Sequence, residues 1–185
     1  GNAAEHLFKL LESKVGDKKV RIGVVSQEVN SLSITQRTSG FIDKMVELLN
    51  KKGIKTAVTG HDKFKNDVNE ADAKVVIEVR VPAQVDDAAG KTEASTVLEK
   101  EDTVAIYGSN EFAAKAIINA NGGFKESKLG ADKILAVGFD SGALQQDAIR
   151  KGIFVGSVTQ DPVQIGYQAV KLAIAAAKGE TVKDV

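Results

Sequence analysis

The run VRIGVVS, residues 20–26, is short, apolar and rich in β-branched side chains, which predicts a strand buried on both faces. Five further runs of this kind follow, at residues 54–59, 75–81, 103–107, 134–139 and 155–158. Helical patterns alternate with these runs, at residues 3–14, 34–52, 87–100, 111–121, 142–151 and 162 to about 178. The polar segment 61–73 fits either a loop or a short helix.

Strands that alternate with helices predict an α/β fold in which helices cover both faces of a mostly parallel sheet. Right-handed crossovers then make it a three-layer, doubly wound domain. In such a domain the loops after the carboxyl ends of the strands line the ligand crevice. Functional side chains are therefore expected in four loops, at residues 26–37, 107–111, 139–142 and 159–162.

Composition narrows the classes of function. The chain has 25 Lys+Arg and 25 Asp+Glu, and this zero formal net charge gives no indication of a nucleic acid or an anionic membrane as a partner. It has no Cys, which excludes disulfides, zinc–thiolate sites and Cys nucleophiles, and only two His. The 185 residues suit one globular domain with a buried core, and we expect no cofactor, no metal and no catalytic residue.

One polar side chain stands out near the end of each of four predicted strands: Arg37, Asn110, Asp140 and Gln160. Together they offer a cationic donor fork, two amides that donate and accept, and a carboxylate that accepts. This set suits a polyol, because each hydroxyl both donates and accepts and adjacent hydroxyls are held well by Asp and Arg. Taken singly, Asn110 and Asp140 fit helix caps equally well, and Arg37 fits a solvated helix residue.

Four segments resemble those of the ribose-type periplasmic binding proteins. The run QRTSGF at 36–41 is similar to the family's R-x-x-G-F segment, and SNE at 109–111 with Ala113 and Ala114 to its N-D/E-x-x-A segment. The run AVGFD at 136–140 is similar to its V-G-F-D strand end, and TQDP at 159–162 with IGYQAV at 165–170 to its Q-x-P-x-x-x-G-x-x-A-V segment. The opening run GNAAEHLFKLLE resembles the helix after the first crossing between lobes, so the resemblance covers nearly the whole chain.

This resemblance implies the carboxy-terminal lobe of a two-lobed, non-catalytic sugar receptor of an ABC transporter. It implies that Arg37, Asn110, Asp140 and Gln160 hydrogen-bond the sugar, with Gln160 near the hinge. It also implies a membrane permease as partner. The location that it implies is periplasmic or extracellular, and a lipid anchor that holds the protein before processing is a further alternative. Compared with the family pattern, the chain lacks the amino-terminal lobe, and residues 53–73 read as an insertion of one strand plus a loop.

By the same resemblance, residues 1–161 form the ligand-binding lobe, and residues 162–185 form a helix and tail that would pack on the missing lobe. The helix has an apolar face that includes Ile165, Val170, Leu172, Ile174 and Ala175. An uncovered face of this kind is unfavourable in a monomer. We expect the helix either to fold back onto the lobe or to be buried by a second copy in a homodimer.

Three other functions remain open at this point. A LacI-type repressor has an effector-binding core of the same fold and would show a helix-turn-helix upstream, and a signalling protein can use the fold as an extracellular sensing domain. An enzyme is the third, but the sequence has no G-x-S-x-G elbow, no P-loop and no G-x-G-x-x-G after a strand. The pair Asp86-Asp87 is interpreted as the solvated start of a helix.

Overall fold

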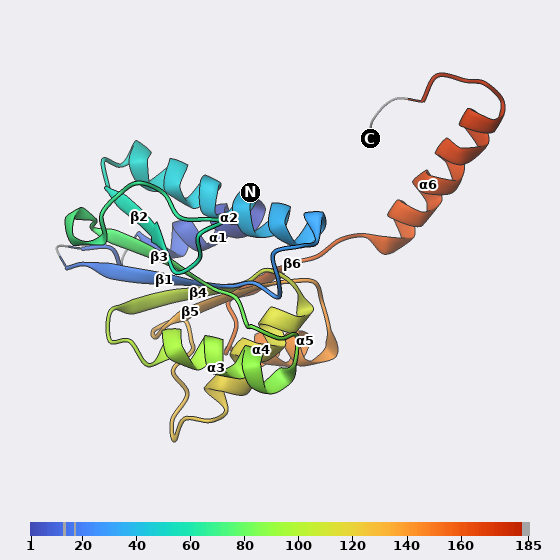
Figure 1. The fold of residues 1–185 in the computed structure, drawn as a ribbon. Helices are drawn as coiled ribbons and strands as arrows, with labels where there is room; N and C mark the ends of the chain where they lie inside the picture. The colour runs from blue at the N-terminus through green and yellow to red at the C-terminus, as the bar shows by residue number, and fades with distance from the viewer. Residues whose placement is uncertain (13, 17, 183–185) are drawn as a thin grey trace.

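The computed structural model describes residues 1–12, 14–16 and 18–182, and shows one sheet between two layers of helices, with a last helix standing apart (Figure 1). The strands are β1 (Val20–Val25), β2 (Thr56–Thr59), β3 (Val75–Arg80), β4 (Thr103–Gly108), β5 (Leu135–Phe139) and β6 (Gly156–Val158). The helices are α1 (Asn2–Leu11), α2 (Leu32–Lys51), α3 (Asp87–Leu98), α4 (Glu111–Asn121), α5 (Ala143–Arg150) and α6 (Pro162–Ala177), with one 3-10 turn, η1 (Glu70–Asp72).

The sheet order is β2-β3-β1-β4-β5-β6, and every neighbouring pair is parallel. The chain builds β2 and β3 on one side of β1, and then crosses to build β4, β5 and β6 on the other side. This reversal beside β1 is the switch point at which doubly wound sheets open a crevice. The predicted three-layer α/β fold is therefore confirmed.

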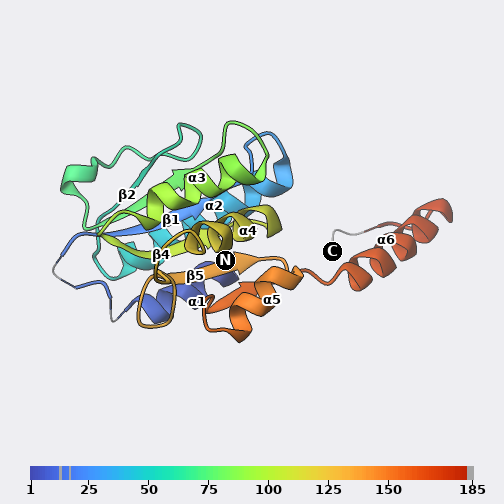
Figure 2. The same ribbon diagram turned by 90° about the horizontal axis from the view of Figure 1, so that it is seen from below.

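Two apolar clusters hold the layers together. On one face α1 and α2 pack on the sheet through side chains such as Leu7, Phe41 and Met45. On the other face α3, α4 and α5 pack through side chains such as Val97 and Ile117. Figure 2 shows the same arrangement from below. Both faces of the sheet are covered, which explains why its strands read as nearly continuous apolar runs.

The segment 53–73, predicted to hold one extra strand and a loop, contains β2, a loop and the η1 turn. Strand β2 lies at the edge of the sheet and, among the described strands, pairs only with β3. Asn66 ties the loop to this strand, since its Oδ1 accepts from Val58 N at 3.0 Å and its Nδ2 donates to Thr56 O at 3.1 Å. Ser13 of the predicted first helix, and residues 183–185 of the predicted tail, lie outside the described residues.

Helix α6 does not fold back onto the lobe, so that part of the sequence prediction is wrong. The helix points away from the sheet in both views, and none of its residues is buried (Figures 1 and 2). The physical reason is that α1 to α5 already cover both sheet faces, so no bare face remains for a sixth helix. Val163, Tyr167, Val170 and Ile174 form an exposed stripe at helical spacing along it. None of the described helices is both long and apolar enough to span a bilayer.

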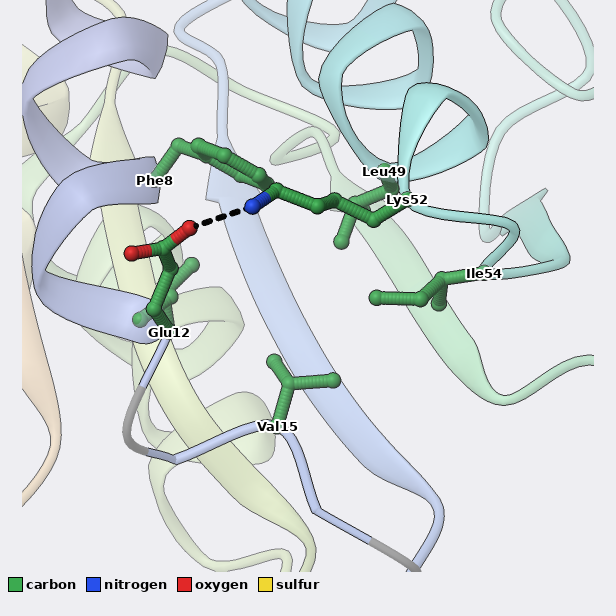
Figure 3. A pocket seen from close by; sticks show the side chains of 7 residues that line it. Phe8, Glu12, Val15, Leu49, Lys52 and Ile54 are labelled. Atoms are coloured by element: carbon green, nitrogen blue, oxygen red, sulfur yellow. Dashed lines mark ion pairs between the residues drawn. The ribbon is translucent and has the colours of Figure 1, made fainter.

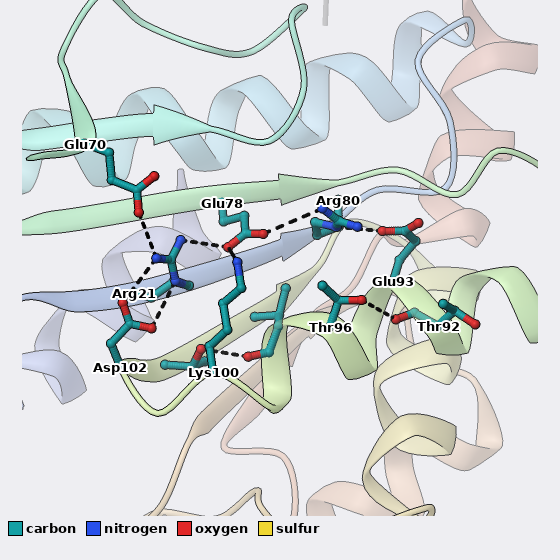
Figure 4. A network of polar contacts seen from close by, with 11 residues as sticks. Arg21, Glu70, Glu78, Arg80, Thr92, Glu93, Thr96, Lys100 and Asp102 are labelled. Atoms are coloured by element: carbon teal, nitrogen blue, oxygen red, sulfur yellow. Dashed lines mark hydrogen bonds and ion pairs between the residues drawn. The ribbon is translucent and has the colours of Figure 1, made fainter.

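A network of ion pairs lies over strands β1 and β3, beside helix α3 (Figure 4). Arg21 lies at its centre, with side-chain nitrogens 2.7 Å from Glu78, 2.9 Å from Glu70 and 3.0 Å from Asp102. Lys100 reaches Glu78 from the other side, at 2.6 Å. Burial opposes the charge of Arg21, but its hydrogen bonds to Asp102 and Glu70 and the attraction of Glu78 outweigh this and raise its pKa.

Gly108, the last residue of β4, is expected to tolerate no side chain. A Cβ at this position would lie 2.7 Å from the backbone nitrogen of Ala114 in α4, so strand and helix would have to separate. We expect Gly108→Ala to lower the free energy of unfolding by about 2 kcal/mol in urea denaturation. The control is Gly166→Ala on α6, where a Cβ meets nothing within 4 Å, and an equal loss in both variants would contradict the packing argument.

Candidate functional site

The four residues singled out in the sequence all lie at the carboxyl ends of the strands. Arg37 belongs to α2, which follows β1, and Asn110 is the N-cap of α4, two residues after β4. Asp140 follows β5, and Gln160 follows β6. Because all six strands are parallel, these four positions share one edge of the sheet, on both sides of the switch point.

Arg37 and Asp140 are in direct contact. Arg37 Nη1 donates to Asp140 Oδ2 at 3.2 Å, although the two residues are 103 positions apart in the chain. The guanidinium also lies over the ring of Phe139, 4.2 Å from its centroid, which fixes its plane. Both side chains stay partly exposed, at 20% and 29%, so the pair faces a space that a ligand can enter.

The carboxylate of Asp140 has a second donor. Its Oδ2 accepts from the backbone nitrogen of Glu111 at 3.2 Å, and Glu111 is the first residue of α4. The N-terminus of a helix attracts negative charge, so this bond helps to position the Asp140 carboxylate at the carboxyl edge of the sheet. Asp140 does not cap the helix that follows it, because Gly142 is the N-cap of α5 and makes no side-chain cap bond.

Asn110 is a helix cap, as the alternative interpretation of the sequence had it. Its Oδ1 accepts from Ala113 N at 3.0 Å, and its Nδ2 donates to Gln27 Oε1 at 2.6 Å. The side chain is buried, and these two bonds give each of its polar atoms a partner within this chain. A ligand would therefore meet Gln27 and Asn110 as one linked pair of amides that joins the loops after β1 and β4.

Gln160 is exposed and makes no side-chain hydrogen bond to any residue that the structure describes. It lines a pocket of about 320 Å³ together with Glu111, Asp140, Ser141, Gly142 and Pro162. Its amide is free to donate and accept beside the Asp140 carboxylate. Asp140 thus borders the same pocket as Gln160 and contacts Arg37, which lines the wall of a separate pocket, and Asn110 lies on the neighbouring loop.

Sequence reasoning missed several side chains at this edge. Phe139 is the last residue of β5, and Gln27 and Glu111 lie two and three residues after β1 and β4, so a place at or near a strand end was the signal that could have found them. A second pocket of about 340 Å³ continues from Arg37 past Phe139 to Phe41 and Tyr107. These last two rings stack with centroids 4.1 Å apart, and burial raises the pKa of Tyr107, so its hydroxyl stays neutral at ordinary pH.

A chain of buried hydroxyls lies beneath the switch point. Ser26 Oγ lies 2.9 Å from Thr38 Oγ1 and 3.5 Å from Ser109 Oγ, and these residues come from the ends of β1 and β4 and from α2. All three are fully buried. They tie together the elements that carry Arg37 and Asn110, which keeps the positions of these two residues fixed relative to each other.

A different hollow lies at the opposite end of the molecule, between α1 and α2 (Figure 3). It has a volume of about 290 Å³, and its wall is mostly apolar, formed by Phe8, Leu11, Val15, Leu49 and Ile54. The ion pair of Glu12 with Lys52, at 2.9 Å, lies across it. This hollow has few polar groups to orient a hydroxylated ligand, so we place the candidate site at the carboxyl edge.

Among the described residues, no group of three His, Asp or Glu side chains is arranged to hold a metal ion. The polar groups at the carboxyl edge are instead a guanidinium, a carboxylate and three amides. Their chemistry is the recognition of neutral donors and acceptors by hydrogen bonds.

Residues 2–181 match a family described as the periplasmic binding protein domain. One similar solved structure, described as an ABC transporter, LacI family transcriptional regulator, comes from Brachyspira murdochii; it is 32% identical, has a TM-score of 0.77, and the match covers 97% of this chain and 54% of that one. No curated protein matches the chain.

Two further similar structures show the fold. The periplasmic component of an ABC-type sugar transport system from Hahella chejuensis is 22% identical, with a TM-score of 0.68, covering 98% of this chain and 56% of that one. The binding protein of the arabinose ABC transporter from Shewanella sp. ANA-3 is 17% identical, with a TM-score of 0.68, covering 98% and 51%. The chain spans about half the length of these solved relatives.

Proposed function

This chain belongs to the periplasmic binding protein family, and from that premise we propose that it is the carboxy-terminal lobe of a receptor that binds a sugar for an ABC-type importer. The observation that carries the proposal is the Arg37–Asp140 pair at the carboxyl edge of the sheet, partly open to solvent and next to the free amide of Gln160. Adjacent hydroxyls of a sugar could bridge Asp140 oxygens and Arg37 nitrogens in one plane.

In the proposed mechanism a second lobe closes over this edge when the sugar binds. Closure would remove water from the Arg37–Asp140 pair and so strengthen each of its hydrogen bonds. The ligand would stabilise the closed state only through contacts that are absent from the open one. Gln160 lies one residue before Asp161, the N-cap of α6, so its contact with the sugar would sit where the chain leaves the lobe.

Non-enzymatic action, a periplasmic location and a membrane permease as partner are parts of the same proposal. They are supported by the family match and by the names of the similar structures, which refer to ABC sugar transport. An extracellular location and a lipid anchor remain predictions from the sequence.

A second candidate function is the effector-binding core of a transcription regulator. It is favoured by the relative from Brachyspira murdochii, whose name refers both to an ABC transporter and to the LacI family. The two functions differ in what the full-length protein would contain. A DNA-binding domain that retards operator DNA would support the regulator and contradict the receptor.

The test is a thermal-shift screen of the full-length protein against pentoses and hexoses, including L-arabinose. A ligand at 100 times its dissociation constant is expected to raise the free energy of unfolding by about 2.7 kcal/mol. The Asp140→Asn variant, which loses the carboxylate, should show a smaller shift with the same sugar. If no sugar shifts the wild-type protein while another class of solute does, the sugar assignment is wrong.

Helix α6 leads to a prediction about the chain on its own. We propose that a second copy covers the stripe of Val163, Tyr167, Val170 and Ile174 in a homodimer. Burying one valine contributes about 1.5 kcal/mol or more, so Val170→Asp should raise the dimer dissociation constant at least about tenfold in analytical ultracentrifugation. Gln168→Asp places the same charge off the stripe and is the control. A wild-type chain that sediments as a monomer at all concentrations would contradict the homodimer.

A further inference from the structure

Asp140 has a backbone conformation that is unfavourable for its side chain. Its φ is 73°, and it is the one residue other than glycine with a positive φ among those that the structure describes. The left-handed region brings Cβ close to the carbonyl oxygen, so residues other than glycine enter it singly, Asp among them, and contacts with their surroundings help to hold them there. Such strain is typical of functional sites, and the groups that hold Asp140 in place are therefore of interest.

Both backbone polar groups of Asp140 are bound by neighbouring elements. Its nitrogen donates to Val158 O in β6 at 2.8 Å. Its carbonyl oxygen accepts from Ser157 Oγ at 2.6 Å and from Gln145 Nε2 at 3.2 Å. Strand β6 and helix α5 therefore hold the turn after β5 from two sides.

Gln145 is an unusual choice for this position. It is 1% exposed, and its Oε1 is buried without a partner among the described residues. A buried acceptor without a donor is destabilising, and an apolar side chain of similar size would avoid it. The Nε2 atom of the same amide also donates to Phe139 O at 2.9 Å, and it lies 3.2 Å from Ser157 Oγ.

Gly138 makes room for this arrangement. A Cβ on this residue would lie 2.7 Å from Gln145 Nε2 and 3.0 Å from Ser157 Oγ. The two polar side chains thus occupy the space directly beside the strand that ends in Phe139 and Asp140. The glycine, the serine and the glutamine form one local unit whose polar atoms converge on the backbone of Asp140.

We propose that Gln145 and Ser157 are positioning residues for the sugar site, because they hold Asp140 in the left-handed conformation that turns its carboxylate toward Arg37 and Glu111 N. Neither residue touches the ligand in this proposal. It rests on the proposed function of Asp140 as a sugar-binding residue. In this proposal ligand affinity also depends on the Ser157 hydroxyl and the Gln145 amide, which bind the backbone carbonyl of Asp140.

The test uses Ser157→Ala and Gln145→Met in the full-length protein. The first readout needs no ligand: crystal structures should show that residue 140 leaves the positive-φ region and that Arg37 no longer donates to Asp140. Ser157→Thr keeps the hydroxyl and should preserve both features. The control is Gln146→Met, because Gln146 is a neighbouring amide on α5 that bonds Ser141 O, at 2.8 Å, and not Asp140.

The second readout is affinity for L-arabinose and the sugar panel by calorimetry. Ser157→Ala and Gln145→Met should weaken binding by about tenfold, while Ser157→Thr and Gln146→Met stay within about twofold of the wild type. A residue 140 that keeps its positive φ and its bond to Arg37 in both variants overturns the inference. If the conformation changes as expected but the wild-type protein binds no sugar, the positioning role stands and the proposed function fails.

Discussion

Replacing Arg37 with alanine is expected to weaken sugar binding by the full-length protein by about two orders of magnitude. Arg37 neutralises Asp140 through the contact of 3.2 Å, and the closing lobe would desolvate both groups. Without the guanidinium, Asp140 would keep a single donor, Glu111 N, for a charge about to be buried. Isothermal titration calorimetry with the sugar that gives the largest thermal shift measures the effect.

One further variant separates charge from geometry at this position, and a second serves as its control. Arg37→Lys keeps the positive charge but loses the planar fork that lies over Phe139, so most of the affinity should still disappear. Arg150→Ala is the matched control, because Arg150 lies on α5 and, among the residues that the structure describes, its side chain bonds only Gln146. Unchanged affinity in Arg37→Ala would mean that the sugar binds elsewhere.

The largest expected effect on stability comes from Arg21. Its side chain is 9% exposed and pairs with Glu70, Glu78 and Asp102, so Arg21→Met leaves three carboxylates facing one another with Lys100 as a remaining partner. We expect a loss of about 3 kcal/mol in the free energy of unfolding, from urea denaturation. The control is Lys51→Met, which removes an exposed pair with Glu47 and should cost under about 1 kcal/mol.

A double variant tests whether the network acts as a unit. Glu78 is as buried as Arg21, so Arg21→Met combined with Glu78→Leu removes the most buried charge of each sign together. In Arg21→Met most of the loss comes from the buried Glu78 carboxylate, which loses Arg21 and keeps Lys100, so the double variant should be less destabilised than the sum of the two single ones. Simple additivity would show that these two charges do not depend on each other.

The order of strands and helices could be predicted because its signals are local. Apolar, β-branched runs mark the strands, Pro162 opens α6, and Gly53 follows α2 with a φ of 73°. The parallel sheet then follows from general rules of chain connection, which place all strand ends at one edge. This is why four side chains near strand ends could be predicted to share an edge before any contact was known.

What the sequence could not predict depends on contacts between distant segments. The stacking of Arg37 on Phe139 and the bond of Asn110 to Gln27 join loops that are about 80 to 100 residues apart in the chain. The left-handed turn at Asp140 depends on Ser157 and Gln145 and has no glycine to signal it. The direction of α6 depends on how residues 159–161 leave β6, and no hydrophobic pattern specifies that.

Arg21, at the centre of the ion-pair network, and the proposed sugar site lie toward opposite ends of the same strands. Arg21 is the second residue of β1 and Asp102 precedes β4, whereas Gln27 and Asn110 follow the same two strands. A six-residue strand is about 20 Å long, which exceeds the range over which substitutions usually influence each other. Mutations that alter which sugar is preferred can therefore accumulate in evolution, or in a designed biosensor, without lowering the melting temperature of the scaffold.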